Sequence, residues 1–215
     1  MVGVMLAALT PSHAVVIDHF DSPVGGQTIS ITNGVLGTST SSIEGGLATI
    51  GGSWEMYVVV DHVYDTGNEV KVGANSNTSL DHLSYANDAN VDTTCRLTWD
   101  ALGGGLNTDV STETGFQLLE LFNDSPCNYT IGLQTFGGGS STQFISSTAG
   151  YRGDITFPMA GFTGGADLTH VDRITLTISG GEAADVSVNA LITVAEPAAA
   201  MLGGFGVLLL LRRRR

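Results

Sequence analysis

Short runs of apolar and β-branched residues, separated by turn-forming residues, recur along most of this chain. The strongest run, residues 54–63, contains consecutive valines, which favour a strand that is central in a sheet or buried on both faces. Residues 173–178 and 185–189 instead alternate apolar and polar positions, as antiparallel strands with one face in the core do. No convincing amphipathic helix lies between residues 15 and 194. The pattern therefore predicts an all-β domain.

Turn signals separate about a dozen predicted strands at the spacing seen in β-sandwiches. We therefore expect two packed antiparallel sheets of jelly-roll type, with a β-barrel as the alternative. No linker or internal repeat divides residues 15–194, so they are expected to form one domain. The predicted strands are residues 15–20, 27–32, 43–50, 54–63, 69–72, 80–85, 91–99, 115–122, 127–136, 142–147, 154–157, 171–179 and 184–194.

The composition agrees with this fold class and argues against two kinds of partner. The chain has 29 glycines and only 13% charged residues, a turn-rich composition that suits strands better than helices. Residues 15–194 carry twenty acidic side chains against four basic ones, a net charge of −16. A domain this acidic repels nucleic acids and anionic membrane surfaces, so neither is expected as a partner.

The two ends of the chain differ from the domain between them. Residues 2–9 are apolar or small, and small residues at Ser12 and Ala14 suit a signal peptidase, so residues 1–14 are expected to be a signal peptide, with a buried first strand as the alternative. Residues 198–211 are uncharged and predict a short transmembrane helix, with a buried C-terminal helix as the alternative. By the positive-inside rule, the four arginines that follow would anchor the helix on the cytoplasmic side. These are Arg212, Arg213, Arg214 and Arg215.

Ala195, Glu196 and Pro197 stand directly before this apolar run. The order of Glu-Pro motif, apolar helix and terminal arginines over residues 195–215 resembles the PEP-CTERM sorting signal of exported proteins of Gram-negative bacteria. Ala195 stands where that family has its first proline. The resemblance implies processing by exosortase, a membrane enzyme, during an inner-membrane stage, followed by location in the cell envelope or outside the cell. A membrane anchor that is never cleaved is the neighbouring interpretation.

The only cysteines are Cys95 and Cys127. In an exported protein, two cysteines usually form one disulfide, which we therefore expect, with two buried or free thiols as the alternative. Neither cysteine belongs to a Cys-x-x-Cys pair, so redox or nucleophilic catalysis is not expected.

Acidic residues offer a candidate metal site. Asp18, Asp21 and Asp185 fall on or near the first and last predicted strands, which often lie side by side in jelly rolls. Ca²⁺ needs six or more oxygen ligands, several of them carboxylates or carbonyls. A structural Ca²⁺ ion at these three residues is one interpretation, and solvated surface acids are the other.

Aromatic and acidic residues suggest two further sites. Glu55, Asp100 and Glu120 could in principle supply the carboxylate pair of a glycosidase, although spacing in sequence does not show separation in space. Seven aromatic side chains could form a sugar-stacking platform like that of carbohydrate-binding modules, although core packing is commoner at strand positions. They are Trp54, Tyr57, Tyr64, Tyr85, Trp99, Tyr129 and Tyr151.

The first functional interpretation is an exported structural protein of the cell surface or extracellular matrix, without catalytic activity and without a required cofactor. Its expected partners are a signal peptidase and an exosortase-type enzyme. The alternative is a glycan-binding module, with an extracellular polysaccharide as partner and a structural Ca²⁺ ion. An exposed row of aromatic residues on one sheet face would favour the alternative, and burial of all of them would exclude it.

Overall fold

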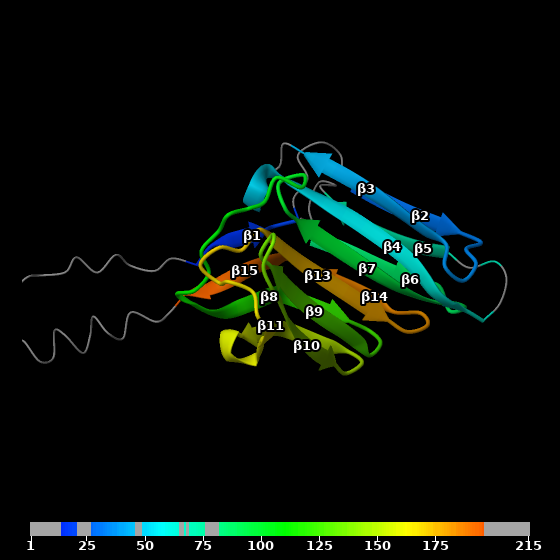
Figure 1. Cartoon of the computed structure of the whole chain (residues 1–215). Helices are drawn as coiled ribbons and strands as arrows, with labels where there is room; N and C mark the ends of the chain where they lie inside the picture. Colours follow the sequence, from blue (N-terminus) through cyan, green and yellow to red (C-terminus); the bar gives the residue numbers. More distant parts are fainter. Residues whose placement is uncertain are drawn as a thin grey trace, which may run out of the picture.

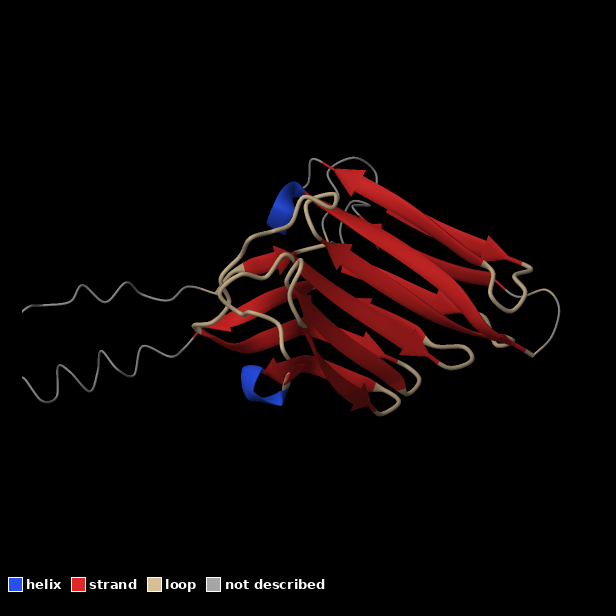
Figure 2. Cartoon of the chain, viewed as in Figure 1, coloured by secondary structure: helices blue, strands red, loops and turns tan. Residues whose placement is uncertain are grey.

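The computed structural model describes residues 14–20, 27–45, 49–64, 67, 69–75 and 82–195. In this part of the chain, two antiparallel sheets pack face to face as a jelly-roll-like sandwich (Figure 1). Helical structure among these residues is limited to two short 3₁₀ turns, η1 (Ile50–Gly52) and η2 (Met159–Gly161), drawn in blue in Figure 2. The predicted all-β fold class with antiparallel sheets is confirmed.

The seven-stranded sheet has the order β12-β10-β9-β13-β7-β4-β3, and every pair in it is antiparallel. Its central strand, β13, lies between β9 and β7, which are far apart in the sequence. The strands are β3 (Ser39–Gly45), β4 (Ser53–Val63), β7 (Val91–Trp99), β9 (Cys127–Gln134), β10 (Ser140–Ser147), β12 (Thr163–Gly164) and β13 (Arg173–Gly180).

The eight-stranded sheet is built around β8, which β11 pairs in addition to β14 and β15. The predicted strand 184–194 is two strands here, β14 and β15, which pair successive parts of β8. The strands are β1 (Val16–Asp18), β2 (Gln27–Thr32), β5 (Glu69–Asn75), β6 (His82–Asn87), β8 (Glu113–Asn123), β11 (Tyr151–Pro158), β14 (Asp185–Val188) and β15 (Ala190–Ala195).

The core lies between the two sheets, and strand alternation assigns side chains to it. In the seven-stranded sheet, Leu97, Leu176 and Ile131 lie opposite one another on neighbouring strands, and all three are fully buried. Their neighbours along each strand point to the outer face, where a period of two places them. β4 also alternates between buried and half-buried residues and lies inside the sheet between β7 and β3, so of the two expectations for it, an interior strand is correct and burial on both faces is not.

Buried aromatic residues fill much of this core, and the polar atoms of Tyr85 and Trp99 have hydrogen-bond partners, whereas the buried Tyr129 hydroxyl has none among the described residues. The Tyr85 hydroxyl donates to the Thr93 carbonyl at 2.7 Å and accepts a hydrogen bond from Asn87 Nδ2 at 2.7 Å. Trp99 Nε1 donates to Asp18 Oδ2 at 2.8 Å. Because an unpaired polar atom in a core is costly, these bonds allow large aromatic residues to be buried.

The first and last strands lie side by side (Figure 1). Val16 pairs with Ile192, and the Val15 backbone N–H donates to Thr193 Oγ1 at 2.7 Å. The first and the last described residues therefore lie at the same edge of the sandwich.

Candidate functional site

The outer face of the seven-stranded sheet carries a groove of about 490 Å³. Side chains of β10, β9, β13, β7 and β4 contribute to it, so it crosses five neighbouring strands. Its lining is polar because the outward positions of these strands are mostly threonine, glutamine and charged residues. The lining residues are Glu55, Arg96, Thr98, Thr130, Gly132, Gln134, Thr142, Arg173, Thr175 and Thr177.

Five threonines form much of the groove surface. Threonine suits a strand because it is β-branched, and its hydroxyl can both donate and accept a hydrogen bond. Over the described part of the chain, none of these five hydroxyls has a hydrogen-bond partner in the protein. The groove therefore presents several hydroxyl groups that a ligand could engage. The threonines are Thr98, Thr130, Thr142, Thr175 and Thr177.

Gly132 keeps the centre of the groove open. It lies in β9 between Thr142 of β10 and Thr175 of β13. A Cβ atom at this position would lie 2.5 Å from Thr175 Oγ1. A glycine inside a strand weakens the strand and often marks a point of close approach by a ligand.

Arg173 is held at one end of the groove by two side chains. Its Nε and Nη2 donate to Asp100 Oδ2 at 3.1 and 2.8 Å, and its Nη1 donates to Gln134 Oε1 at 3.1 Å. The guanidinium also lies 5.3 Å from the centroid of the Phe136 ring. Because Arg173 has these partners, it forms a fixed part of the groove wall.

Arg96 lies on β7 opposite Tyr57 of β4, and its guanidinium is 5.2 Å from the centroid of the Tyr57 ring. Within the described ranges, this guanidinium donates no hydrogen bond to the protein. Arginine has five N–H donors in a planar fork, so Arg96 offers donors to a bound molecule. Arg96 and Arg173 are two of the four basic residues between positions 15 and 194.

Aromatic rings flank the groove on both sides. Phe144, Thr130, Thr177, Arg96 and Tyr57 form one row across the sheet, since each pairs with the next on the neighbouring strand. The two rings at the ends of this row are separated by four strand spacings, roughly 19 Å. The Phe144 side chain is 60% exposed and so contributes little to the core.

A second pocket, of about 240 Å³, adjoins the groove at its β4 end. Glu55 lines both, so the two are neighbours with one wall residue in common. The second pocket differs in character because two largely exposed aliphatic residues, Ile43 and Leu102, form part of its lining. The other lining residues are Ser53, Trp54, Asp100 and Gly103.

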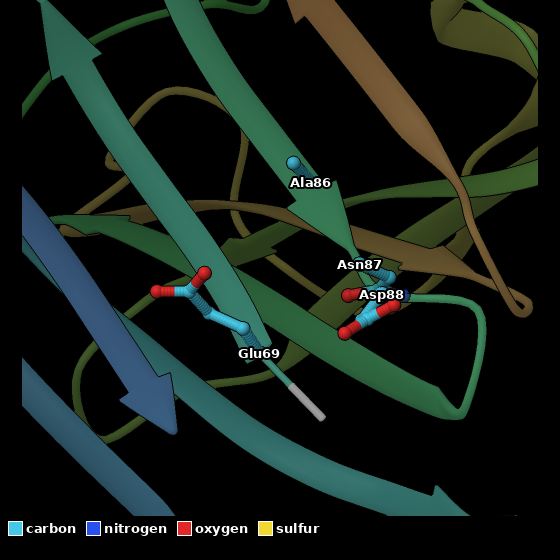
Figure 3. Close-up of a pocket in the computed structure, with 4 residues that line it drawn as sticks. All are labelled: Glu69, Ala86, Asn87 and Asp88. Carbon is cyan, nitrogen blue, oxygen red and sulfur yellow. The ribbon is translucent and has the colours of Figure 1, made fainter. Parts of the chain in front are cut away.

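A third pocket, of about 250 Å³, lies in the other sheet near the β5–β6 pair. Figure 3 shows Glu69 on one strand, with Asn87 and Asp88 at the end of the neighbouring strand. Its lining has two carboxylates but none of the aromatic or guanidinium groups that characterise the groove.

The seven aromatic residues considered for a sugar-stacking platform do not form one, and core packing, the commoner fate at strand positions, holds for four of them. Trp54, Tyr85, Trp99 and Tyr129 are buried in the core. Tyr151 lies in β11 of the other sheet, and Tyr64 donates a hydrogen bond to Asp92 beyond the end of β4. Of the seven, only Tyr57 lies beside the groove.

Sequence reasoning missed Phe144 and Phe136, which do lie on the groove side. The alternation of β10 places Phe144 on the same face as Thr142, two residues earlier. The alternation can be read from the sequence. Placing Phe144 beside the groove also requires knowing which face of β10 is turned away from the core, and the sequence does not give that.

The three carboxylates considered as a glycosidase pair are split between the sheets. Glu55 and Asp100 lie near the groove. Glu120 lies in β8 of the other sheet, where its Oε2 accepts a hydrogen bond from Asn189 Nδ2 at 2.9 Å. Asp100 Oδ1 accepts a hydrogen bond from the Gly103 N–H at 2.9 Å, so both of its oxygens have partners.

The predicted calcium ligands Asp18 and Asp185 are not brought together. Asp18 pairs with Leu191 of β15, so its height in the sheet is that of Leu191. Asp185 lies six residues before Leu191, and six strand residues span roughly 20 Å. Partial burial and then the nearby Asp124 carboxylate raise the pKa of Asp185. Asp21 lies outside the described residues. Among the described residues, no group of three or more His, Cys, Asp or Glu side chains could hold a metal ion.

The predicted disulfide between Cys95 and Cys127 was wrong, and both are free, buried thiols. Strand β13 lies between β7 and β9, which carry the two cysteines. Strands two places apart are separated by roughly 9–10 Å, whereas a disulfide requires Cα atoms within about 7 Å. Burial raises the pKa of the Cys95 thiol to about 12 and that of Cys127 to about 11.

Most of the predicted sorting signal lies outside the described residues. Ala195 is the last residue of β15 and pairs with Glu113 of β8, so the sheet extends one residue past the predicted boundary at 194. Glu196, Pro197 and the four terminal arginines fall in the part that the structure does not describe, as does nearly all of the predicted signal peptide 1–14. No helix within the described ranges has the length and apolar character that crossing a bilayer requires.

Comparison with known proteins finds similarity only in structure. No protein-family model matches the chain, and no curated protein matches it. A family 11 carbohydrate-binding module from Clostridium thermocellum, in complex with a β-1,3-1,4-mixed-linked tetrasaccharide, is 11% identical, with a TM-score of 0.46 over 86% of this chain and 97% of that chain. A family 29 carbohydrate-binding module complexed with mannohexaose is 10% identical, with a TM-score of 0.34 over 86% of this chain and 92% of that one. An exo-β-agarase is 12% identical, with a TM-score of 0.44 over 86% of this chain and 25% of that chain.

The first functional interpretation, a structural protein without a ligand, has no counterpart among these structures, where carbohydrate-binding modules, the class named in the alternative interpretation, recur instead. At this identity the likeness concerns the fold alone. A binding function therefore has to be argued from the groove of this chain itself.

Proposed function

We propose that this domain binds a polysaccharide chain in the groove across β10, β9, β13, β7 and β4. One observation carries the proposal. Among the described residues, the groove combines threonine hydroxyls that have no hydrogen-bond partner in the protein, the available guanidinium of Arg96, and aromatic rings on both sides. Hydroxyls and guanidinium N–H groups can hydrogen-bond to sugar hydroxyls, and aromatic rings can pack against the apolar faces of sugar rings. A groove that crosses five strands suits a chain of sugars better than a single compact molecule.

The charge distribution supports an uncharged polysaccharide. The groove residues Arg96 and Arg173 are offset by the nearby carboxylates Glu55 and Asp100. The domain around them carries a net charge of −16 over residues 15–194. A polyanionic glycan would be repelled by this field, whereas a neutral one would not.

We propose that the domain acts by binding and not by catalysis. A glycosidase of the common type uses two carboxyl groups that flank the scissile bond. Among the described groove and pocket residues, Asp100 is engaged by Arg173 and by the Gly103 N–H, which leaves Glu55 without a second available carboxylate there. We therefore expect that incubation of the protein with a polysaccharide it binds releases no reducing sugar.

We further propose that the domain is exported and sorted through residues 195–215 by a PEP-CTERM-like signal. The support is the order of motif, apolar run and arginines in the sequence. The mass of the mature protein from its host should then show a start at Val15 and the loss of the terminal arginines. A protein that keeps Met1 and remains in the cytoplasm would contradict this.

The binding proposal is tested by titrating the purified protein with a panel of neutral polysaccharides. Arg96→Ala and Tyr57→Ala should each weaken binding by about tenfold, as truncation of an important contact residue does. Arg152→Ala is a matched control because Arg152 stacks on Phe122, 4.2 Å from the ring centroid, but in the other sheet. Equal losses in the control and the groove variants, or no binding to any neutral polysaccharide, would contradict the proposal.

A further inference from the structure

The pocket beside the groove has an apolar side that the groove lacks. Ile43 lies opposite Glu55 on the edge strand β3, and its side chain is 62% exposed. Leu102 comes from the loop after β7 and is 67% exposed. Both line the pocket of about 240 Å³ that continues the groove beyond β4. A chain lying in the groove would therefore meet an apolar pocket at this end.

Leu102 is held in this position at a conformational cost. It has φ +56° and follows Ala101 at φ +53°, so two successive residues with side chains adopt the left-handed conformation. This conformation disfavours residues with a Cβ atom, and an exposed leucine regains little by burial. Such strain, kept at an exposed residue, is a feature of binding sites.

Asp100 fixes the loop that carries Leu102. Its Oδ1 accepts a hydrogen bond from the Gly103 N–H at 2.9 Å, and its carbonyl oxygen accepts one from the Gly105 N–H at 2.8 Å. The same Asp100 holds Arg173 of the groove through Oδ2. The loop and the groove wall are thus joined through one carboxylate.

Ser53 supplies a hydrogen-bonding group inside this pocket. Its side chain lines the pocket and the residue is only 3% exposed. In the part of the chain that the structure describes, its hydroxyl has no hydrogen-bond partner. Ser53 Oγ is also not among the buried polar atoms that lack a partner, so this hydroxyl is open to the pocket and available to an acceptor on a bound molecule.

We propose that this pocket binds an acyl group on the polysaccharide, so that the domain selects O-acetylated over unsubstituted chains. The inference rests on the proposed binding of a neutral polysaccharide in the groove. An O-acetyl group has a carbonyl oxygen, which the Ser53 hydroxyl can reach as donor, and a methyl group, which Ile43 and Leu102 can cover. A bare sugar hydroxyl would lose hydrogen bonds to water against these two aliphatic side chains.

The test compares one neutral polysaccharide, acetylated glucomannan, before and after mild alkaline deacetylation, and repeats the comparison with acetylated xylan. The acetylated form should bind at least about fourfold more tightly, because burial of one methyl group corresponds to that ratio. Ser53→Ala and Leu102→Ser should each reduce this preference while leaving the affinity for the deacetylated chain unchanged. Leu36→Ser is the matched control, because Leu36 is 71% exposed in the turn between β2 and β3, away from the pocket.

The outcomes separate this inference from the function on which it rests. Equal affinity for acetylated and deacetylated chains would overturn the inference and leave polysaccharide binding in place. Loss of the preference in the Leu36→Ser control would also overturn it. Failure of the protein to bind either form, or any other neutral polysaccharide, would instead refute binding in the groove.

Discussion

Trp99 and Asp18 connect the two sheets through a buried hydrogen bond. Trp99 Nε1 of β7 donates to Asp18 Oδ2 of β1 at 2.8 Å. The other carboxylate oxygen accepts a hydrogen bond from the Phe20 N–H at 2.7 Å. Asp18 is only 4% exposed, so its carboxylate depends on these donors in place of water. Asp18 was predicted as a calcium ligand, and the structure gives it this role in the core.

Trp99→Phe should therefore destabilise the domain. The change removes a donor from a buried carboxylate and leaves a small cavity, and together these should lower the free energy of unfolding by about 2–4 kcal/mol. Denaturant unfolding followed by far-ultraviolet circular dichroism measures the effect without relying on tryptophan fluorescence. Trp54→Phe is a control with a similar change in volume at a buried position, since no hydrogen bond of the Trp54 ring occurs among the described residues. Equal losses in both variants would show that the Asp18 bond contributes nothing.

The buried thiols predict a loss of stability at high pH. The folded-state pKa values of Cys95 and Cys127 are raised to about 12 and about 11, above the ordinary thiol value of 9.0. A group whose pKa is raised by folding stabilises the protein below its unfolded pKa and loses this contribution as the pH rises toward the folded value. The free energy of unfolding should thus fall above pH 9 by about 1.4 kcal/mol per pH unit for each thiol.

A double variant, Cys95→Ala and Cys127→Ala, tests the cause of this decline. It should show a shallower fall in stability between pH 9 and pH 10 than the native chain, measured by denaturant unfolding at each pH. The native chain should also keep the same melting temperature with and without a reducing agent, because its thiols are free. A fall of melting temperature on reduction would indicate a disulfide and contradict the structure.

Leu102→Gly should leave the stability of the domain unchanged or raise it. Glycine removes the steric cost of φ +56° at this position, which partly offsets its greater freedom in the unfolded chain, so the free energy of unfolding should stay unchanged or rise by up to about 1 kcal/mol. Ile43→Gly is the matched comparison, because Ile43 is equally exposed but lies in a regular strand, where glycine should cost about 1 kcal/mol. Thermal unfolding of the two variants measures the difference. A clear destabilisation by Leu102→Gly would contradict the account of strain.

Gly132→Ala should weaken polysaccharide binding while having only a small effect on the stability of the domain. The added Cβ would lie 2.5 Å from Thr175 Oγ1, so the Thr175 side chain must rotate and the open centre of the groove is filled. We expect about tenfold weaker polysaccharide binding, in the range found for important contact residues. Gly165→Ala is the control, because a Cβ there would meet no atom within 4 Å. Titration of both variants should show a loss only for Gly132→Ala, and full affinity in that variant would place the ligand elsewhere.

Local patterns predicted the strands well, because alternation reflects the burial of one sheet face. Strands β2 and β7 have the predicted limits, 27–32 and 91–99. Residues 43–50 were predicted less well: β3 begins earlier, at Ser39, and a 3₁₀ turn occupies Ile50–Gly52. Serine and threonine occupy the first four positions of β3, so its start has no apolar signal.

Pairings between distant residues were predicted poorly. The sequence indicates that Cys95 and Cys127 lie in strands, but not that β13 comes between these strands. The sequence indicates that Asp18 and Asp185 belong to the first and last strand regions. It does not indicate that they lie at different heights along those strands, and so apart. In each case the residue type was a reasonable signal, and the strand order decided the outcome.

By itself, the sequence determined the fold class, the alternation of strands such as β13 and β14 and the acidity of the domain, because these depend on local composition and on a period of two. Only the tertiary structure decided which faces are turned outward, and so which residues meet. It brought Arg96, Gly132 and Arg173 together from three strands and sent Trp54 and Trp99 into the core. The physical reason is that a groove across a sheet is formed by strand order and register, which depend on contacts between residues far apart in the chain.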